Sequence, residues 1–540
     1  MNSTSSPTQS RRMEIPHLDT DARTRDGASI VLETARERGV DICFANPGTT
    51  EMPFVVALDR VAGVRPILGL FEGVCTGAAD GYGRMAGKPA MTLLHLGPGH
   101  ANGIANLHNA RRARTPILNI VGDHARAHLK YDAPLTSDIE SLARPVSVWY
   151  RSVAHADDLA RDTAAAIAAA TAAASGVATL VLPVDLQSAA VNETASQPRA
   201  QAAPAVPAFD AARLARVADL LRTGVPAVLL LGVRALSARG QKAAARIAAA
   251  TGAACFGETF PARAERGGGL PDIDRLPYFP EPARAALAGR KVVLAGALAP
   301  VTYFAYEGIP GELAPPEDLV TLADPGEAAD AALEALAEAV GATADVDGVR
   351  VARWNVEAGP LTPQTAGRVL ADALPDDAIV SIEGGTCGYP FVTASARARR
   401  HTILTNTGGA IGQGLPVALG AAVACPARRV FALQSDGSAQ YTIQALWTMA
   451  RERLPIVMLI ASNRRYAILQ TELARNGQPA DTPHASRLTL LDDPPIDWLA
   501  LSAGYGVPAE RVSTTQALSR ALDDALAHTD GPRLIEMCLA

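Results

Sequence analysis

The chain has 540 residues, of which 48% are hydrophobic and 19% are charged, and its formal net charge is −6. This length exceeds what one ordinary hydrophobic core accommodates, so we expect two to four domains of a water-soluble globular protein. The negative charge argues against nucleic acid as the main partner, because phosphate backbones require concentrated Lys and Arg. No apolar run reaches the roughly 18 residues of a membrane span, so we expect no membrane association either.

The N-terminal residues and the cysteines indicate the compartment. Residues 1–27 are polar and lack the apolar core of a signal peptide, so they predict a disordered tail. The six cysteines follow no CxxC spacing, which is typical of a reducing cytoplasm and not of a disulfide framework or a zinc site. They are Cys43, Cys75, Cys255, Cys387, Cys425 and Cys538. We therefore expect a cytoplasmic protein.

Apolar runs alternate with helical stretches from residue 28 to residue 191. Strand-like runs occupy residues 40–44, 90–95, 117–121 and 178–183. This alternation predicts a parallel sheet with helices on both faces.

The rest of the chain contains two more α/β blocks. Residues 192–209, rich in Pro, Ala and polar residues, predict a linker to a middle block at 210–343. A second loose stretch, 344–359, leads to a third block at 360–540. The predicted fold class is thus α/β, with three tandem doubly wound parallel-sheet domains.

Two polar side chains follow consecutive apolar runs of the third block, namely Asp436 and Asn463. A strand, a crossover helix and a second parallel strand fit between them. A right-handed crossover brings both strand ends to the carboxyl edge of the sheet, where open α/β sheets bind ligands. A helix beginning near Ser438 would offer free N–H groups to phosphate there. The sequence therefore predicts a site for Mg²⁺ and a diphosphate.

The Asp-Gly-Ser … Asn pattern around Asp436 and Asn463 resembles the thiamin diphosphate (ThDP) motif, usually written Gly-Asp-Gly … Asn-Asn. Ser435 and Ser462 replace the flanking Gly and Asn, but both ligand positions are kept. The chain is thereby identified as a member of the superfamily of ThDP-dependent 2-oxo acid decarboxylases and acetolactate synthases. The resemblance implies a pyrimidine-binding domain, a middle domain and a diphosphate-binding domain, in this order, for the three blocks.

Glu72 opens a run of small residues, 72–84, that resembles the catalytic-glutamate helix of this family, with Cys75 and Gly83 in place of Ala. Because an apolar stretch precedes Glu72, we expect a partly desolvated carboxyl group. The resemblance implies that Glu72 shares a proton with N1′ of the cofactor's aminopyrimidine and so activates the cofactor. The alternative is a glutamate placed only by the helix dipole.

The segment Asn46-Pro47-Gly48-Thr49 resembles a turn of benzoylformate decarboxylase in which a serine contacts the substrate carboxylate. Thr49 keeps that hydroxyl, and the resemblance implies cofactor contacts for Asn46 and Pro47. By itself, Asn-Pro-Gly predicts only a turn.

His95 stands at the same offset from Glu72 as an active-site histidine of benzoylformate decarboxylase, which implies an acid/base role. The alternative is a structural histidine at a strand end. The Gly-Pro-Gly-x-x-Asn segment that follows, ending at Asn102, is instead typical of acetolactate synthases. The site motifs are therefore a mosaic of the two branches.

Further site residues follow from the resemblance alone. Gly409 would accept a hydrogen bond from the 4′-amino group, and Ile411 would prop the cofactor into a bent shape that brings its reacting atoms together. Mg²⁺ would be held by Asp436, Asn463 and the carbonyl of Arg465. Other cofactor contacts are implied for Gly385, Thr386, Gly437, Ser438, Tyr441, Tyr466, Ala467 and Ile468.

Two departures leave the substrate open. Phe304 stands where benzoylformate decarboxylase has a second active-site histidine, and the Gln-Trp pair of acetolactate synthases is absent after Asn463. The middle block has no clear FAD signature, so we expect no flavin.

The function that the sequence favours is that of a non-oxidative decarboxylase of a 2-oxo acid, with carboligation as an added activity. The enzymatic alternative is an acetolactate synthase-like condensation of two 2-oxo acids. A third alternative is an inactive cofactor-binding scaffold or regulatory subunit, against which the joint retention of Glu72, Asp436 and Asn463 argues. The family's domains meet across subunits, which implies a homodimer or homotetramer.

Overall fold

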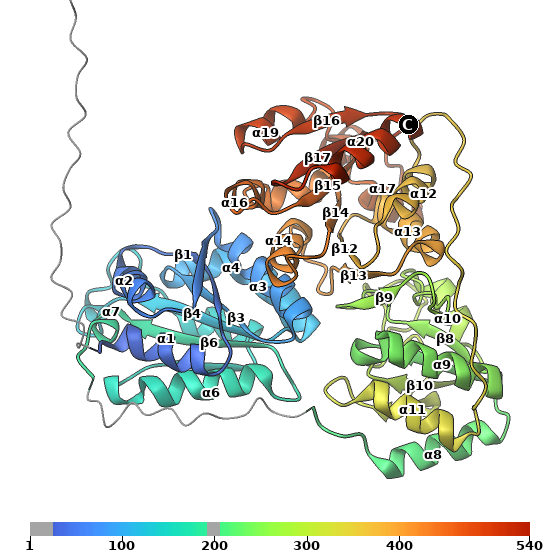
Figure 1. Ribbon diagram of the computed structural model, residues 1–540, viewed down its shortest axis with the longest axis horizontal. Helices are drawn as coiled ribbons and strands as arrows, with labels where there is room; N and C mark the ends of the chain where they lie inside the picture. Colours follow the sequence, from blue (N-terminus) through green and yellow to red (C-terminus); the bar gives the residue numbers. More distant parts are fainter. Residues whose placement is uncertain (1–24, 192–205) are drawn as a thin grey trace, which may run out of the picture.

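The computed structural model describes residues 25–191 and 206–540, which form three α/β blocks, each built on its own sheet (Figure 1). The first block lies on the left of Figure 1, the third at the upper right and the middle block at the lower right. The α/β class expected from the sequence is confirmed. Within the described ranges, no helix is long and apolar enough to cross a membrane.

The first block holds a six-stranded parallel sheet in the order β2-β1-β3-β4-β6-β5. Its central strands are buried throughout, as expected for a parallel sheet covered on both faces. Helices α1, α2 and α6 pack on one face, and α3 and α4 on the other. The strands are β1 (Ile42–Asn46), β2 (Arg65–Leu68), β3 (Ala90–Leu94), β4 (Ile117–Asp123), β5 (Trp149–Ser152) and β6 (Val177–Pro183). The helices are α1 (Gly27–Glu37), α2 (Met52–Arg60), α3 (Glu72–Ala86), α4 (Leu96–Ala113), α5 (Ile139–Ala143), α6 (Leu159–Thr171) and α7 (Val184–Gln187).

The start of this block corrects one boundary. The expected tail of residues 1–27 is too long, because Asp26 caps α1 by accepting a hydrogen bond from the N–H of Ser29 at 2.9 Å. Asp26 also forms a bridge with Ala190 at the end of the block. Residues 1–24, and most of the expected linker at 192–209, lie outside the described residues.

The middle block has a four-stranded parallel sheet in the order β11-β10-β7-β8. Helices α8, α9 and α11 cover one face, and α10 covers the other. Its strands are β7 (Ala227–Leu231), β8 (Ala254–Gly257), β10 (Lys291–Ala295) and β11 (Leu319–Ala323). Its helices are α8 (Ala211–Arg222), α9 (Ala238–Thr251), α10 (Pro280–Leu287) and α11 (Ala329–Ala339).

The third block holds a seven-stranded sheet in the order β16-β17-β15-β14-β12-β13-β9. The strand order reverses between β12 and β14, and such switch points leave a crevice at the carboxyl edge. The strands are β12 (Ala378–Ile382), β13 (His401–Thr405), β14 (Val430–Ser435), β15 (Ile456–Ser462), β16 (Ala509–Val512) and β17 (Arg533–Cys538). The helices are α12 (Pro363–Ala373), α13 (Gly385–Ala394), α14 (Gly414–Ala424), α15 (Asp436–Ala439), α16 (Ala445–Arg451), α17 (Ala467–Arg475), α18 (Pro483–Thr489), α19 (Trp498–Gly504) and α20 (Thr515–Ala527).

The edge strand β9 (Ala264–Arg266) differs from the sequence expectation. It pairs antiparallel with β13, although its residues lie in the middle block. The third sheet is therefore not wholly parallel, and the middle block is joined to it by main-chain hydrogen bonds.

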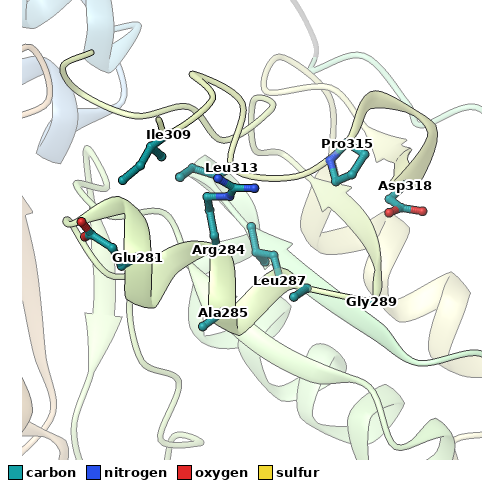
Figure 2. A pocket seen from close by; sticks show the side chains of 10 residues that line it. Glu281, Arg284, Ala285, Leu287, Gly289, Ile309, Leu313, Pro315 and Asp318 are labelled. Carbon is teal, nitrogen blue, oxygen red and sulfur yellow. The ribbon is translucent and has the colours of Figure 1, made fainter. Parts of the chain in front are cut away.

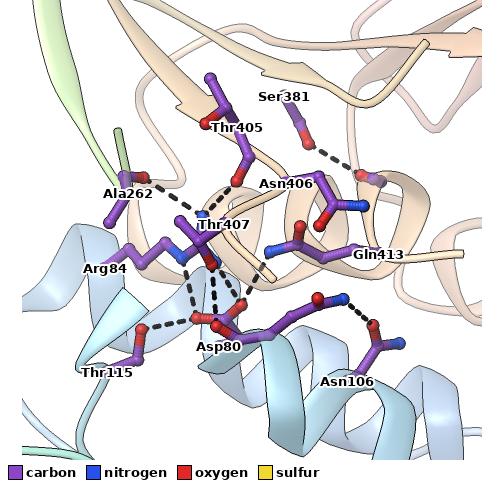
Figure 3. Close-up of polar contacts among 12 residues, drawn as sticks. Asp80, Arg84, Asn106, Thr115, Ala262, Ser381, Thr405, Asn406, Thr407 and Gln413 are labelled. Atoms are coloured by element: carbon purple, nitrogen blue, oxygen red, sulfur yellow. Dashed lines mark hydrogen bonds and ion pairs between the residues drawn. The ribbon is translucent and has the colours of Figure 1, made fainter. Parts of the chain in front are cut away.

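A buried polar cluster also joins the blocks (Figure 3). Arg84 of α3 forms a two-bond ion pair with Asp80, at 2.8 and 2.6 Å, and both side chains are almost fully buried. Arg84 also donates to the carbonyls of Thr405, at 2.7 Å, and Ala262, at 3.2 Å. Gln413 of the third block donates to Asp80 at 2.9 Å. One arginine therefore contacts all three blocks.

Helices α3 and α14 approach each other closely because glycines face each other across the contact. A Cβ at Gly81 would lie 2.1 Å from the carbonyl oxygen of Val417, and one at Gly420 would lie 1.9 Å from that of Ala78. Neither position can hold a side chain without moving a backbone. The small residues expected to allow close packing of the Glu72 helix do so against α14.

We predict that Gly420→Ala destabilises the protein, because its methyl group would meet backbone in a packed contact, which costs about 1–3 kcal/mol or more. The melting temperature should fall by several degrees. Gly504→Ala is the control, because its added methyl would meet nothing within 4 Å. Equal melting temperatures for the two variants would contradict the close packing of α3 on α14.

Candidate functional site

The third block brings its predicted site residues to the carboxyl edge of its sheet. Strands β14 and β15 are parallel neighbours, with Ser435 opposite Ala461. Asp436 begins α15 directly after β14, and Asn463 follows β15 directly. Helix α15 starts at Asp436, two residues before the helix start expected near Ser438, so Asp436 itself lies in its first turn.

Asp436 is buried, and burial raises the pKa of its carboxyl group, while backbone N–H groups oppose this shift. Its oxygens accept hydrogen bonds from the N–H of Gly437 at 2.9 Å and of Arg464 at 2.6 Å. Arg464 has a positive φ of 57°, a conformation that residues other than Gly rarely adopt and that often occurs at functional sites. A buried carboxylate of this kind is a suitable ligand for a cation.

Asn463 completes the candidate metal site. Its side chain donates to the hydroxyl of Thr386 at 3.3 Å and accepts from the N–H of Arg465 at 3.1 Å. Asn463, which follows β15, is thereby hydrogen-bonded to Thr386, which follows β12. In the part of the chain that the structure describes, no cluster of three or more His, Cys, Asp or Glu side chains could hold a metal. A magnesium ion here would rely on Asp436, Asn463, a carbonyl and phosphate oxygens.

Tyr466 lies over the turn at Gly437, where a Cβ would come within 2.4 Å of the tyrosine ring. Burial and the neighbouring Tyr441 raise the pKa of Tyr466. Ala467 begins α17, and Ile468 follows with 48% of its surface exposed. Ser438 donates to the carbonyl of Ser435 at 3.2 Å. Glycine at 437 therefore makes room for the ring of Tyr466 against the backbone at the start of α15.

The glycine-rich loop 406–412, which carries Gly409 and Ile411, is held by Glu383. The Glu383 carboxylate accepts hydrogen bonds from the N–H groups of Gly412, Gln413 and Gly414, at 2.5, 2.9 and 3.0 Å. Burial raises the pKa of Glu383 to about 7. The sequence analysis missed this role, although a glutamate directly after the buried strand β12 was a signal.

Helix α4 of the first block forms hydrogen bonds with the same loop. His108 and Asn109 bind the carbonyls of Gly408, at 3.0 Å, and Ala410, at 2.8 Å. Gly409 has a positive φ of 79° and open space around it. The loop therefore presents Gly409 toward free space from a fixed backbone, as a cofactor contact requires.

The first block holds Glu72 and His95 side by side. Asn102 donates to the Glu72 carboxylate at 3.0 Å. A Cβ at Gly99 would lie 3.0 Å from that carboxylate and 3.4 Å from Cβ of His95, so Gly99 lies between the two. Both side chains are half-buried.

Glu51 fixes the orientation of His95. Its carboxylate is fully buried and lies 2.7 Å from Nδ1 of His95. It also accepts hydrogen bonds from the N–H of Gly48 at 2.7 Å and the hydroxyl of Thr50 at 2.6 Å. The other ring nitrogen, Nε2, is therefore the one available to a substrate. The sequence analysis missed Glu51, although it quoted the segment that contains it.

The remaining predicted residues of this block surround the same turn. Asn46 donates to the carbonyl of Gly69 at 2.9 Å, which ties the turn to the loop before α3. Thr49 is exposed beside Pro47. His100, by contrast, is fully buried, and burial lowers its pKa to about 4, as expected of a structural histidine.

The predicted residues thus form two groups. Among the described residues, no hydrogen bond or ion pair joins Glu72 or His95 to Asp436 or Asn463. Phe304, at the position of the second histidine, is 59% exposed. The first group, which contains Glu72 and His95, can supply acid/base chemistry. The second group, which contains Asp436 and Asn463, can hold a metal and phosphate.

The chain matches two family models for thiamine pyrophosphate (TPP) enzymes, TPP being another name for ThDP. They are the N-terminal TPP binding domain, over residues 25–142, and the C-terminal TPP binding domain, over residues 385–537. A Mycobacterium tuberculosis (strain H37Rv) protein, provisionally named as the acetolactate synthase large subunit IlvX, is 50% identical over 95% of this chain and 98% of its own length. Benzoylformate decarboxylase of Pseudomonas aeruginosa is 32% identical over 94% of this chain and 97% of that enzyme.

Solved structures of ThDP-dependent enzymes have a similar fold. The ThDP-dependent 4-hydroxybenzoylformate decarboxylase of Rhodococcus jostii RHA1 has a TM-score of 0.82 and 26% identity, over 95% of this chain and 99% of that one. Benzoylformate decarboxylase of Polynucleobacter necessarius shares the fold, with a TM-score of 0.80, 23% identity, and coverage of 96% and 99%. The chain therefore belongs to the ThDP-dependent enzymes, in the family of benzoylformate decarboxylases and acetolactate synthase large subunits.

We predict that Glu383→Gln changes how stability depends on pH. A carboxyl group whose pKa is raised from 4.5 to about 7 on folding binds more protons in the native state between these values. Its contribution is therefore present below pH 4.5 and is lost as pH rises through about 7. The melting temperature of the cofactor-free wild type, relative to that of Glu383→Gln, should fall between pH 5 and pH 8. A difference that does not change with pH would contradict this assignment.

Proposed function

We propose that the protein is a ThDP- and Mg²⁺-dependent decarboxylase that releases CO₂ from a 2-oxo acid without oxidising it. The observation that carries the proposal is the His95–Glu51 pair beside Glu72. Loss of CO₂ leaves a carbanion equivalent that needs a proton, and a histidine oriented by a buried carboxylate can provide one. The 32% identity to a benzoylformate decarboxylase supports the same reaction class.

The residues have separate tasks in this proposal. Asp436, Asn463 and the carbonyl of Arg465 would hold Mg²⁺ and, through it, the diphosphate. Glu72 holds the proton that activates the cofactor, and the hydroxyl of Thr49 would bind the substrate carboxylate. When bound, ThDP would supply a carbon nucleophile for the 2-oxo group and an acceptor for the electron pair that remains when CO₂ leaves.

A second candidate is an acetolactate synthase-like condensation of two 2-oxo acids. It is favoured by the 50% identity to the M. tuberculosis relative and by the Gly-Pro-Gly-x-x-Asn segment, whose Asn102 binds Glu72. Both candidates start with CO₂ release, so they differ only in what accepts the remaining two-carbon or longer fragment.

We also propose that no flavin is needed. The crevice between the ends of β7 and β10, where the strand order of the middle sheet reverses, is the place where such a sheet would bind a nucleotide. The carboxyl group of Glu258 fills it, since a Cβ at Gly232 would lie 1.7 Å from this group. Burial raises the pKa of Glu258 to about 8.

Finally, we propose a homodimer or homotetramer whose active sites lie between subunits. Large apolar side chains are exposed near both groups of site residues. Near the first are Met52, Val56 and Leu70, and near the second are Tyr441, Ile468 and Leu469, each 44–55% exposed. A second copy that brought its Glu72 group to this chain's Asp436 group would cover such surfaces.

A screen of 2-oxo acids with ThDP and Mg²⁺ present tests the proposed function. The products should be CO₂ and the matching aldehyde, with no acetolactate from pyruvate. Acetolactate would favour the second candidate. No CO₂ from any 2-oxo acid, with ThDP bound, would favour the inactive scaffold.

We predict that His95→Ala lowers kcat/KM by at least about 10²-fold, the typical contribution of positioned proton transfer. The dissociation constant of ThDP should change little, because His95 belongs to the other group of residues. Glu51→Gln should lower kcat/KM less, since the amide can still hold the ring. His155→Ala is the matched control, because it removes an exposed histidine of the same block and leaves the pair intact. Activity of His95→Ala within about threefold of wild type would make this histidine structural.

A further inference from the structure

Arg275 of the middle block reaches a pocket at its boundary with the third block. Its backbone is fixed beside β8, because Gly257 donates to the carbonyl of Asp274 and accepts from the N–H of Leu276, both at 2.8 Å. The pocket has a volume of about 20 Å³ and is lined by Arg275 together with Phe260, Glu383, Gly384, Gly385, Tyr389 and Asn406, among others. Residues from two blocks thus line a small pocket beside one half-buried guanidinium group.

This guanidinium has no acidic partner. Among the described residues it makes no hydrogen bond or ion pair, and its contact is with the ring of Tyr389, at 5.2 Å from the ring centre. Burial lowers its pKa. Arg266 of the same block is also buried but donates to the carbonyls of Val392 and Ile273 and to Asp272, at 2.9–3.0 Å. Arg266 is therefore structural, whereas no described residue accepts a hydrogen bond from the guanidinium of Arg275.

The nearby carboxyl groups do not balance the charge of Arg275. Asp274 attracts the charge of Arg275, but its side chain is 72% exposed and lies 4.0 Å from Arg266. Both oxygens of Glu383 accept hydrogen bonds from the glycine-rich loop. Glu258, with its pKa raised to about 8, is largely protonated at neutral pH. A partly buried cation without a counterion is costly, so an anion from outside the chain would be stabilised here.

The pocket adjoins the proposed cofactor site. A Cβ at Gly385 would lie 3.2 Å from the ring of Tyr389, so the ring that Arg275 contacts also covers Gly385. Asn406, on another wall, accepts the N–H of Gly409 at 2.9 Å. Phe260 packs edge-on against Tyr303, at 5.2 Å between ring centres. The pocket therefore offers aromatic walls and one cation, beside residues expected to contact the cofactor.

We propose that Arg275 and the rings of Phe260, Tyr303 and Tyr389 form a subsite for an anionic group at the far end of the 2-oxo acid's side chain. The inference rests on the proposed function and narrows the substrate to 2-oxo acids that carry a second negative charge. A planar carboxylate suits the fork of a guanidinium, and a flat linking group would lie outside the small pocket, against the rings of Tyr303 and Tyr389, which are 42% and 40% exposed.

A larger cavity of about 500 Å³ lies elsewhere in the middle block, between α10 and the segment 309–318 (Figure 2). Its Arg284 is exposed, and none of its residues belongs to the two groups of the proposed active site. This cavity carries no inference about substrate, but Arg284 provides an arginine of the same block for a matched control.

The test compares phenylglyoxylate with 4-carboxyphenylglyoxylate, which differ only in the second carboxylate, using wild type, Arg275→Gln, Arg275→Lys and Arg284→Gln holoenzymes. Wild type should favour the dianion in kcat/KM, mainly through KM. Arg275→Gln should lower kcat/KM for the dianion at least about tenfold and leave the monoanion within about threefold. Arg275→Lys should retain part of the preference, and Arg284→Gln all of it.

Binding gives a readout that does not need turnover. Calorimetry of the ThDP- and Mg²⁺-loaded protein should show tighter binding of terephthalate than of benzoate, and Arg275→Gln should abolish the difference. Equal losses for both substrates, or a weakened dissociation constant for ThDP, would overturn the inference, because Arg275 would then serve the cofactor or the fold. Turnover of monoanions without a preference for dianions would overturn it and leave the proposed function standing. Preferential binding of terephthalate without turnover of any 2-oxo acid would support the anion subsite and refute the decarboxylase.

Discussion

The buried ion pair between Asp80 and Arg84 is the contact on which the arrangement of the three blocks depends. Removing one partner of such a pair leaves a buried charge and costs about 3–5 kcal/mol, although a complete pair adds little over an apolar contact. Here every neighbouring donor and acceptor is used, since Arg84 binds two carbonyls and Asp80 also accepts from Thr115 and Gln413. The pair therefore selects one relative position of the blocks rather than simply adding stability.

That position matters because the cluster encloses the glycine-rich loop. Thr405 precedes the loop and Gln413 follows it, so both of its ends are fixed to α3. Glu383 holds its N–H groups from the third block, and α4 holds its carbonyls from the first. The loop that would contact the cofactor is thus shaped by two blocks of the same chain. Because α14 begins at Gly414, directly after the loop, we expect a change at the α3–α14 contact to alter the position of Gly409.

Sequence reasoning worked where a chemical role is encoded locally. Asp436 and Asn463 each follow a buried strand directly, so strand, turn and helix could be recognised from a few adjacent residues, and parallel pairing placed both at one edge. It failed where a role depends on a distant partner. Glu383 acts through N–H groups of a loop far along the chain, and Arg275 is notable only because no acid reaches it. The pairing of β9 with β13 joins segments of different blocks, which no local pattern reveals.

The division of tasks among the blocks explains how one chain can resemble two kinds of enzyme. The first and third blocks carry the groups that any ThDP reaction needs. Where they meet, the backbones of α3 and α14 lie so close together that Gly81 and Gly420 cannot be replaced without moving one of them. The middle block adds the edge strand β9 and the rings of Phe260 and Tyr303, which lie near Arg275 and near Tyr389 of the third block. Identity to a decarboxylase and to a synthase-like relative shows the family, whereas the choice of substrate has to be argued from side chains of the site, such as Arg275 in the proposed subsite.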